Sequence, residues 1–420
     1  MLNLFQYSFY SKSSGKIYGI VFSNNDLSKI FEYYSCIKLS QEYGKPFFEY
    51  NDIDPTFKEI NKMSRNDTGI DCCDLDRTIV QCKLRKTTLT WKECSTFFGS
   101  QNIFSQEVKI QMCHPFGDVL KNEFYDNCFA PLVDAIPNVE RRDTIVVSGK
   151  TIEGKNWVGC CGSYIGTFVG PFLEIPPTGH LVHMRFHEFY CFQDDKIIEV
   201  QEIWDIPELM MQAGAWPMSP SLGREMFIPG PASQDGLTSA NRASSHGTES
   251  LDVVIEMLTN LSRHPSEGGP EIMKAEEYWH PCVNWYGPAG IGSMRGLDGF
   301  RNWHQIPFLK ALPDRKGGTT GTLSCHFFGD GPYVIATGWP NMQMTVSGDG
   351  WLGIAPSGQK ITMRSLDFWR VENNLIRENW VLVDLLDVYS QIGVDVFSRL
   401  REFNKARVSG KVSYPIGVSI

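Results

Sequence analysis

A chain of 420 residues is longer than one hydrophobic core usually serves, so its length predicts roughly two to four domains. Its composition, 42% hydrophobic and 12% aromatic, is that of a globular protein, and no run of about eighteen apolar residues predicts a membrane span. The formal net charge of -9 excludes a broad basic surface that would coat nucleic acid.

The first residues and the cysteines bear on the compartment. The opening stretch, MLNLFQYSFYSKSSGK, lacks the continuous apolar segment of a signal peptide. The twelve cysteines include no CxxC pair, so neither a zinc ribbon nor a disulfide scaffold is expected. These features predict a cytoplasmic protein with reduced thiols and no membrane partner.

Residues 1–105 differ in composition from the rest of the chain and are rich in Lys, Asn, Phe, Tyr and Ser. A helical pattern, NDLSKIFEYYSCIKLSQEYGKPF, precedes the stretch NDTGIDCCDLDRTIVQCKLRK. That order resembles the Mrr-type branch of the PD-(D/E)xK nucleases and implies a small, partial α/β restriction-endonuclease-like unit. Asp71, Gln81 and Lys83 match the pattern residue by residue, and Glu32 is a looser match for the acid on the helix.

The resemblance implies a chemistry for this unit. Asp71 would bind Mg²⁺, Lys83 would stabilise the attacking hydroxide, and the neighbouring basic residues would attract DNA. The alternative is an amphipathic hairpin that contains a QxK triplet by chance. The unit also lacks the later strand and helix of that family, which fits either an unusual fusion or a gene model that joins unrelated pieces.

The next segment, residues 106–215, predicts a first domain of mixed structure. A helical stretch, FYDNCFAPLVDAIPNVERRD, precedes strands in TIVVSGKTIEGKNWVGCCGSYIGTFVGPFLEI. A hairpin and a closing helix follow. Little precedes the first helical stretch, so this domain is expected to lack an opening helix.

Residues 216–249 are rich in Pro, Gly and Ser and predict a linker. Ser250 then predicts the cap of a helix whose apolar face opens a second domain, residues 250–405. This domain contains another helical stretch, GLDGFRNWHQIPFLKALPD, then strands, a hairpin and a closing helix. Residues 406–420 form a tail.

The two domains are copies of one another. Sliding the chain by 179 positions aligns 175–215 with 354–394 without a gap, from Ile175 and Ile354 through to Gly214 and Gly393. In each copy the aligned segment predicts a Pro-x-Gly turn, a strand, a polar turn at 194–195 or 373–374, a second strand and a helix.

The run GIAPSGQKITMRSLDFWRVENNLIRENWVLVDLLDVYSQIG, with WYGPAGIGSMRGLDGF and ALPD, resembles the SnoaL-like polyketide cyclases, also called ester cyclases, of the nuclear transport factor 2 superfamily. The resemblance covers roughly residues 110–405. It implies an α+β fold in which each copy is a cone-shaped, curved antiparallel sheet with helices. It also implies an intramolecular aldol reaction on a small apolar carbonyl compound, without metal or cofactor, and a pairing of cones that fits a homodimer.

Ring closure of this kind needs a base that removes a carbon-bound proton and a donor that protonates the new alkoxide. Asp384 is the candidate in the second copy, since it ends a strand at the start of the closing helix. The same position also suits a plain helix N-cap. Asp205 is its equivalent in the first copy, whereas Asp367 is expected to form a structural salt bridge.

Three further residues complete the candidate site. Arg364 and its equivalent, Arg185, are placed to orient a carbonyl group, and His187 adds a polar group on the strand face of Arg185. The sequence HEFYC lacks the second histidine of an HExxH zinc motif, so no metal is expected in either cone. The alternative function is a DNA-binding or Mg²⁺-dependent nuclease whose cones bind a ligand or pair with one another.

Overall fold

The computed structural model describes residues 103–237, 244–263, 267–318 and 323–409, together with five short strands before residue 103. Contacts divide the chain into two compact units, Met1–Ile103 and Phe104–Ile420. In the first unit β1 (Lys16–Ile17) pairs with β2 (Ile20–Val21). A second antiparallel sheet there has the order β3 (Phe47–Glu49), β4 (Cys72–Asp74), β5 (Ile79–Val80).

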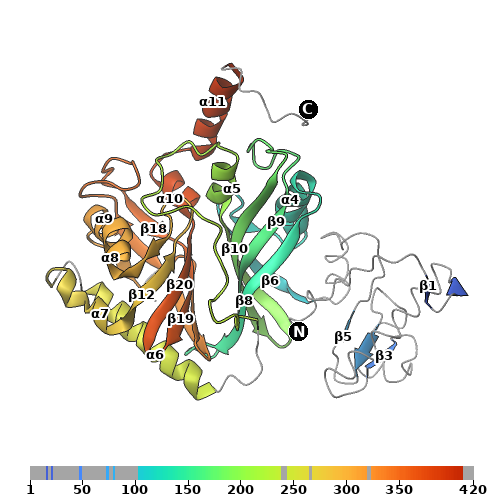
Figure 1. Cartoon of the computed structure of the whole chain (residues 1–420), viewed down its shortest axis with the longest axis horizontal. Coiled ribbons are helices and arrows are strands. Elements are labelled where there is room, and N and C mark those ends of the chain that lie inside the picture. The colour runs from blue at the N-terminus through green and yellow to red at the C-terminus, as the bar shows by residue number, and fades with distance from the viewer. Residues whose placement is uncertain are drawn as a thin grey trace. The chain divides into compact units, whose positions relative to one another are not determined.

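The first copy forms a six-stranded sheet in the order β7-β6-β11-β10-β9-β8 (Figure 1). Its strands are β6 (Phe104–Met112), β7 (Asp118–Val119), β8 (Glu140–Lys150), β9 (Asn156–Thr167), β10 (Leu181–Gln193) and β11 (Lys196–Trp204). Its helical segments are a π-helical turn η3 (Tyr125–Phe129), α4 (Ala130–Ala135) and α5 (Ile206–Gln212).

The second copy repeats this sheet in the order β13-β12-β20-β19-β16-β15. Its strands are β12 (Trp279–Tyr286), β13 (Met294–Arg295), β15 (Cys325–Asp330), β16 (Tyr333–Gly338), β19 (Ser365–Glu372) and β20 (Leu375–Val383). A small sheet beside it has the order β14 (Lys316–Gly317), β17 (Met342–Thr345), β18 (Lys360–Met363).

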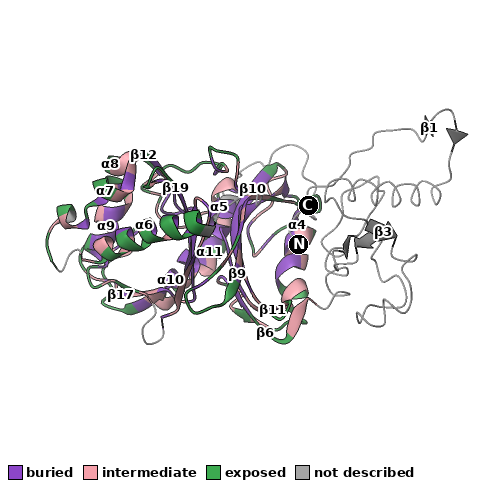
Figure 2. Cartoon of the chain, turned by 90° about the horizontal axis from the view of Figure 1, so that it is seen from below, coloured by how far each residue is buried: buried purple, intermediate pink, exposed green. Residues whose placement is uncertain are grey.

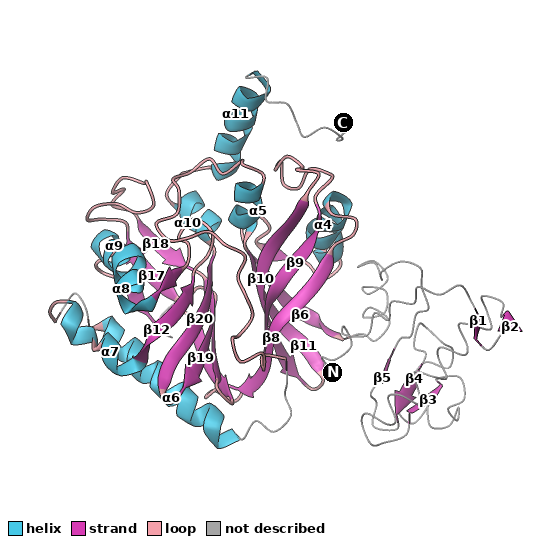
Figure 3. Cartoon of the chain, in the orientation of Figure 1, coloured by secondary structure: helices cyan, strands magenta, loops and turns pink. Residues whose placement is uncertain are grey.

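Helices lie on the outer sides of the two sheets and also near the upper ends of the sheets in the view of Figure 3. Those of the second copy are α6 (Ser244–Ser262), η4 (Pro270–Met273), α7 (Ala275–Tyr278), α8 (Gly296–Phe300), η5 (Arg301–Gln305), α9 (Ile306–Ala311), α10 (Leu385–Gln391) and α11 (Val396–Ser409). The chain therefore has the expected α+β fold, with two curved sheets and helices. No described helix is long and apolar enough to cross a membrane.

The predicted hairpins are confirmed, and local turn chemistry explains them. Asp194 and Asp195 have φ of 50° and 59°, and Asn373 and Asn374 have φ of 51° and 60°. Two consecutive residues with positive φ suit a tight two-residue hairpin turn, and Asp and Asn tolerate that conformation better than most residues. The same two-residue solution therefore closes the β10–β11 and the β19–β20 hairpins.

Two expectations need correction. The sheets are not antiparallel throughout, because β6 pairs parallel with β11 and β12 pairs parallel with β20. The helix expected to be capped by Ser250 begins at Ser244, so Ser250 lies inside α6 and is buried. Residues 244–249 already belong to the helix, although they carry no apolar pattern.

The two sheets pack against each other across one face, and helices cover the other. Phe189 of β10 lies 5.2 Å from Phe368 of β19 between ring centroids, and both side chains are fully buried. We call this side the interface face. On the opposite side, Phe129 packs against Trp204, and Phe300 packs against Trp285. We call that side the helix-covered face; the central strands are buried from both sides (Figure 2).

Candidate functional site

The closing helix of the first copy begins at Asp205. One carboxylate oxygen of Asp205 accepts a hydrogen bond from the backbone N–H of Glu208 (3.3 Å), which makes Asp205 the N-cap of α5. The other oxygen accepts a hydrogen bond from the backbone N–H of Ala289 in the second copy (2.9 Å). Asp205 therefore ends a helix and joins the two copies.

Asp384 repeats this arrangement from the second copy. It caps α10 through the backbone N–H of Asp387 (3.2 Å) and accepts a hydrogen bond from the backbone N–H of His114 in the first copy (3.0 Å). Arg364 Nη1 lies 3.3 Å from the same oxygen. Burial, and then the charge of Asp387, raise the pKa of Asp384 to about 7, while the His114 N–H and Arg364 oppose that rise.

The two arginines differ in burial. Arg185 is 2% exposed, and its Nη atoms donate hydrogen bonds to the carbonyl oxygens of Tyr286 (3.1 Å), Gly287 (2.6 Å) and Val381 (3.2 Å) and to Asp205 (3.3 Å). Arg364 keeps 24% of its side chain exposed, and its guanidinium carbon lies 4.9 Å from the centre of the Trp339 ring. Arg185 thus ties three carbonyl groups of the second copy to the first.

His187 is also part of the contact between the copies. It is fully buried, and its Nδ1 lies 2.6 Å from the carbonyl oxygen of Leu366. Because a carbonyl oxygen can only accept, Nδ1 carries the hydrogen. Burial, and then the charge of Arg185, lower the pKa of His187 well below its usual value, so the ring is neutral. It packs edge-on against Phe368 at 5.0 Å.

The structure therefore gathers the predicted site residues at the interface between the copies. Asp205, Arg185 and His187 lie on one side of it, and Asp384 and Arg364 occupy the equivalent position on the other. Alternation along a strand predicts correctly which of these residues share a face. It does not predict which face meets the other copy, and an acid/base role for these residues stays a prediction.

On the helix-covered face of the first copy, the sequence reasoning missed a cluster of buried polar residues. Glu188 is fully buried and accepts hydrogen bonds from the hydroxyl groups of Tyr164 (2.6 Å) and Tyr190 (2.8 Å). Arg141 forms an ion pair with the same carboxylate. Both oxygens of Glu188 are therefore engaged by donors of its own copy.

The rest of this cluster adds two further acids, Asp143 and Glu202. Arg141 also pairs with Asp143 (2.9 Å). Glu202 lies directly across the sheet from Glu188 and is fully buried. Burial, and then the charge of Glu188, raise the pKa of Glu202 well above its usual value. The hydroxyl of Tyr190 lies 3.3 Å from Glu202 and links the two carboxyl groups.

On the same face of the second copy, Asp367 occupies the position equivalent to Glu188, 179 residues later. It accepts one side-chain hydrogen bond, from the hydroxyl of Ser365 (2.7 Å). Burial raises the pKa of Asp367 to about 7, and the Ser365 hydroxyl opposes that rise. The residue as a whole is partly exposed to solvent.

The salt bridge expected for Asp367 is absent from the described part of the chain, where no cation pairs with it. Its neighbours across the sheet, Ala336 and Val381, are apolar. The repeat explains the contrast with Glu188, because Val381 stands where the first copy has Glu202 and Trp369 stands where it has Tyr190. The second copy therefore has an acid at this position but not the hydrogen-bonding residues that surround Glu188.

Aromatic side chains line the neighbouring part of this face. Trp285 stacks on His304 with ring centroids 4.2 Å apart, and Phe300 lies 5.7 Å from Trp285. Burial, and then the charge of Arg315, lower the pKa of His304 to about 3, so this ring is neutral at physiological pH. The face that carries Asp367 is therefore bordered by flat, uncharged rings.

Within the described residues, no group of three or more His, Cys, Asp or Glu side chains is placed to hold a metal ion. The nuclease-like residues Glu32, Asp71, Gln81 and Lys83 lie outside the described residues. The structure therefore gives their proposed Mg²⁺ site and DNA contact no support.

Comparison with protein families matches the SnoaL-like polyketide cyclase model at residues 103–213 and again at 269–392, together more than half of the chain. The chain belongs to the SnoaL-like polyketide cyclase family. The match confirms the predicted duplication within this family, and it begins at residue 103, at the end of the nuclease-like segment. A sequence comparison with curated proteins finds no significant match.

Solved structures similar to this SnoaL-like chain each correspond to about one copy of it. A putative SnoaL-like polyketide cyclase from a Jannaschia species is 15% identical, covers 36% of this chain and 97% of its own length, and has a TM-score of 0.28. IdmH, a putative polyketide cyclase from Streptomyces antibioticus, is 18% identical and covers 29% of this chain and 88% of its own, with a TM-score of 0.25. TsrD from Streptomyces laurentii is 23% identical and covers 34% of this chain and 96% of its own, with a TM-score of 0.26.

Proposed function

We propose that this chain is an enzyme that performs cofactor-independent acid/base chemistry on a small apolar carbonyl compound, with Asp367 of the second copy moving the proton. The observation that carries the proposal is the state of this carboxylate. It belongs to a partly exposed residue, has one hydroxyl partner and no described counter-ion, and has a pKa raised to about 7 by burial. A group with a pKa near the working pH serves best as both acid and base.

A pKa near the working pH allows Asp367 to act first as a base and then as an acid. The Asp367 carboxylate removes a proton from a carbon next to a carbonyl group, and the resulting enolate carbon attacks a second carbonyl carbon of the same molecule. A carbon–carbon bond forms, the second carbonyl becomes an alkoxide, and the protonated Asp367 returns its proton to that oxygen. Atoms and charge balance without a metal or a redox partner.

The surroundings of Asp367 favour an apolar substrate. Ala336 and Val381 lie beside it across the sheet, and the buried ring of Trp369 follows on the same strand face. An apolar compound loses little on leaving water for such a site, and the low polarity that excludes water also keeps the carboxylate basic.

Two other acids fit this role less well. Glu188, the equivalent of Asp367, has both oxygens engaged by Arg141, Tyr164 and Tyr190. Asp384, the candidate from the sequence, accepts two backbone N–H groups and faces Arg364 at the interface between the copies. An acid/base role for either residue remains an alternative that the same experiment tests.

The experiment is a screen of linear polycarbonyl compounds with the full chain in the presence of EDTA, followed by substitution. Asp367→Asn keeps the shape of the side chain and removes the proton acceptor, so turnover should fall by about 10²- to 10⁴-fold. Because the carboxylate must be ionised to act as base, kcat/KM of the unsubstituted protein should fall as the pH drops below about 7.

Glu188→Gln and Asp384→Asn are the matched controls. Each makes the same chemical change at another buried acid, and circular dichroism with thermal melting shows whether the variants stay folded. We expect both to retain turnover within about threefold, well short of the loss that removing an acid/base group causes. Loss of turnover in Glu188→Gln or Asp384→Asn, with Asp367→Asn still active, contradicts the assignment.

A further inference from the structure

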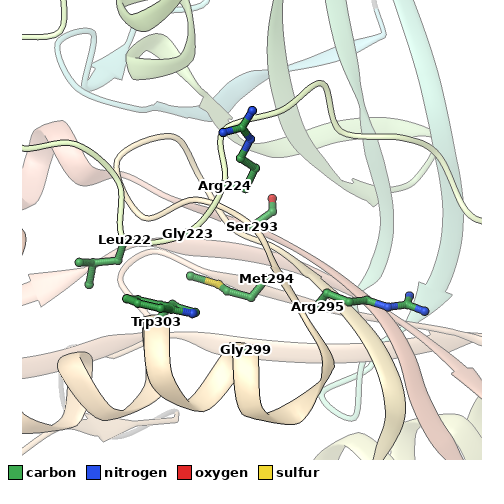
Figure 4. Close-up of a pocket in the computed structure, with 8 residues that line it drawn as sticks. All are labelled: Leu222, Gly223, Arg224, Ser293, Met294, Arg295, Gly299 and Trp303. Atoms are coloured by element: carbon green, nitrogen blue, oxygen red, sulfur yellow. The ribbon is translucent and has the colours of Figure 1, made fainter.

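A surface pocket lies where the segment between α5 and α6 crosses the second copy. We call this segment the connector; it contains Leu222, Gly223 and Arg224. It has a volume of about 390 Å³, within the range of small-molecule sites. The connector supplies Leu222 and Arg224, and the second copy supplies Ser293, Met294, Arg295 and Trp303. Figure 4 shows Leu222, Met294 and Trp303 gathered at one end, with the two arginine side chains extending outward at the periphery.

Backbone pairing holds the connector in place at this pocket. The N–H of Arg224 donates to the carbonyl oxygen of Ser293, and the N–H of Ser293 donates to that of Arg224, both at 2.9 Å. Gly223 and Gly292 allow this close approach, because a Cβ on Gly223 would lie 2.7 Å from the carbonyl carbon of Gly292. The pocket is therefore bounded by a fixed connector.

The apolar end of the pocket presents unusually exposed side chains. Trp303 is 54% exposed and Leu222 is 43% exposed, although both are large and hydrophobic. Met294 lies beside Trp303 and is buried. A ring that stacks on the Trp303 indole and contacts Leu222 would remove this apolar surface from water.

The polar groups of the pocket favour an anion. Two arginines line it and no carboxylate does, and neither arginine forms an ion pair with a described residue. Arg295 donates a hydrogen bond to Asn284 (2.8 Å), whereas Arg224 is exposed. The side chain of Ser293 is 93% buried, and its hydroxyl has no partner among the described residues. Such a group is normally hydrogen-bonded.

We propose that this pocket binds a small aromatic carboxylate, whose ring stacks on Trp303 beside Leu222 and whose carboxylate is bound by Arg224 and the Ser293 hydroxyl. Arginine and a hydroxyl donor together match the two oxygens of a carboxylate. The site is built by the connector and the outer surface of the second copy, so it is distinct from Asp367 and does not rest on the proposed function.

The test is titration calorimetry of the full chain with 2-naphthoate, compared with the neutral 2-naphthamide. We expect 2-naphthoate to bind and to quench tryptophan fluorescence, and 2-naphthamide to bind at least tenfold more weakly. Arg224→Gln and Trp303→Leu should each weaken naphthoate binding at least tenfold, and Ser293→Ala should weaken it to a smaller extent. Arg142→Gln, which changes an exposed arginine of the first copy, should leave binding unchanged.

Other outcomes overturn the proposal. They are no binding of 2-naphthoate at millimolar concentration, equal binding of the two probes, or unchanged naphthoate binding in both Arg224→Gln and Trp303→Leu. Asp367→Asn separates this pocket from the proposed acid/base site, since it should leave naphthoate binding intact. Binding that disappears in Asp367→Asn but survives Arg224→Gln would place the probe at the other site.

Discussion

At the scale of single residues, the partners of a carboxylate decide what it can do. Asp384 and Asp205 each accept one N–H from their own helix and one from the other copy, which are structural contacts. Asp367 has a single hydroxyl partner and apolar neighbours. All three pKa values are raised by burial, but Asp367 alone among them lacks both a backbone donor and an arginine.

Replacing Asp384 with alanine tests its role as a link. The change removes the cap of α10 and leaves the half-buried N–H of His114 without its partner, so we expect a loss of about 1–3 kcal/mol in the free energy of unfolding. Asp395 is a matched control, since it caps α11 by accepting from the Ser398 N–H (2.8 Å) without joining the copies. Urea denaturation should show the smaller loss for Asp395→Ala, and equal losses would argue against the link.

The raised pKa of Asp367 also predicts how stability depends on pH. An aspartate in an unfolded chain has a pKa of about 3.9. Between that pH and about 7 the folded protein binds more protons than the unfolded chain, so this group lowers stability as the pH rises through the window. Asp367→Asn does not titrate, and its stability relative to the unsubstituted protein should increase from pH 4.5 to 7.5. A difference that stays constant with pH in urea denaturation would contradict this.

At the scale of elements, local chemistry predicts some features and leaves others open. The β10–β11 and β19–β20 hairpins follow from polar two-residue turns at positions 179 apart, and the helical stretch before Pro313 appears as α8, η5 and α9. The strands β6 and β12 were not predicted, since each pairs in parallel with a strand distant in sequence. Such pairing depends on contacts that no local pattern encodes.

The surroundings of two glycines predict opposite effects of replacing each one with alanine. A Cβ on Gly329 of β15 would lie 2.1 Å from the carbonyl oxygen of Gly247 in α6, so Gly329→Ala must push the helix off the sheet and should cost about 1–3 kcal/mol. A Cβ on Gly299 in α8 meets its nearest atom at 3.6 Å, so Gly299→Ala should stabilise by about 0.4–1 kcal/mol. Thermal melting of both variants checks the pair, and a stabilising Gly329→Ala would show that α6 is not held there.

At the scale of the whole second unit, the two copies form an internal pair related by the repeat. Asp205 binds the loop after β12 and Asp384 binds the loop after β6, so each copy holds the other by the same contact. The sequence predicted two cones and the residues on each strand face. It could not place Glu188 or Asp367 in a site, because alternation does not say which face meets helices and which meets the other copy.

This pairing bears on whether the second copy folds alone, and we predict that a fragment of residues 245–410 does so. The fragment holds the six-stranded sheet and its helices, so we expect cooperative melting. Separation from the first copy exposes Leu366 and Phe368, which are fully buried in the chain, so the fragment should self-associate through that face. Sedimentation velocity should show a dimer that Phe368→Lys weakens. A fragment that remains monomeric at all concentrations, or melts broadly, contradicts this account.

The most direct test of an acid/base role for Asp367 is the pKa of its carboxyl group, measured without any substrate. Carboxyl-carbon nuclear magnetic resonance of the full chain, labelled at aspartate and compared with the Asp367→Asn variant, identifies its signal and follows it with pH. We expect a midpoint of about 7. A midpoint close to the ordinary value of about 3.9 would show that this carboxylate is solvated like any surface acid and would contradict its proposed acid/base role.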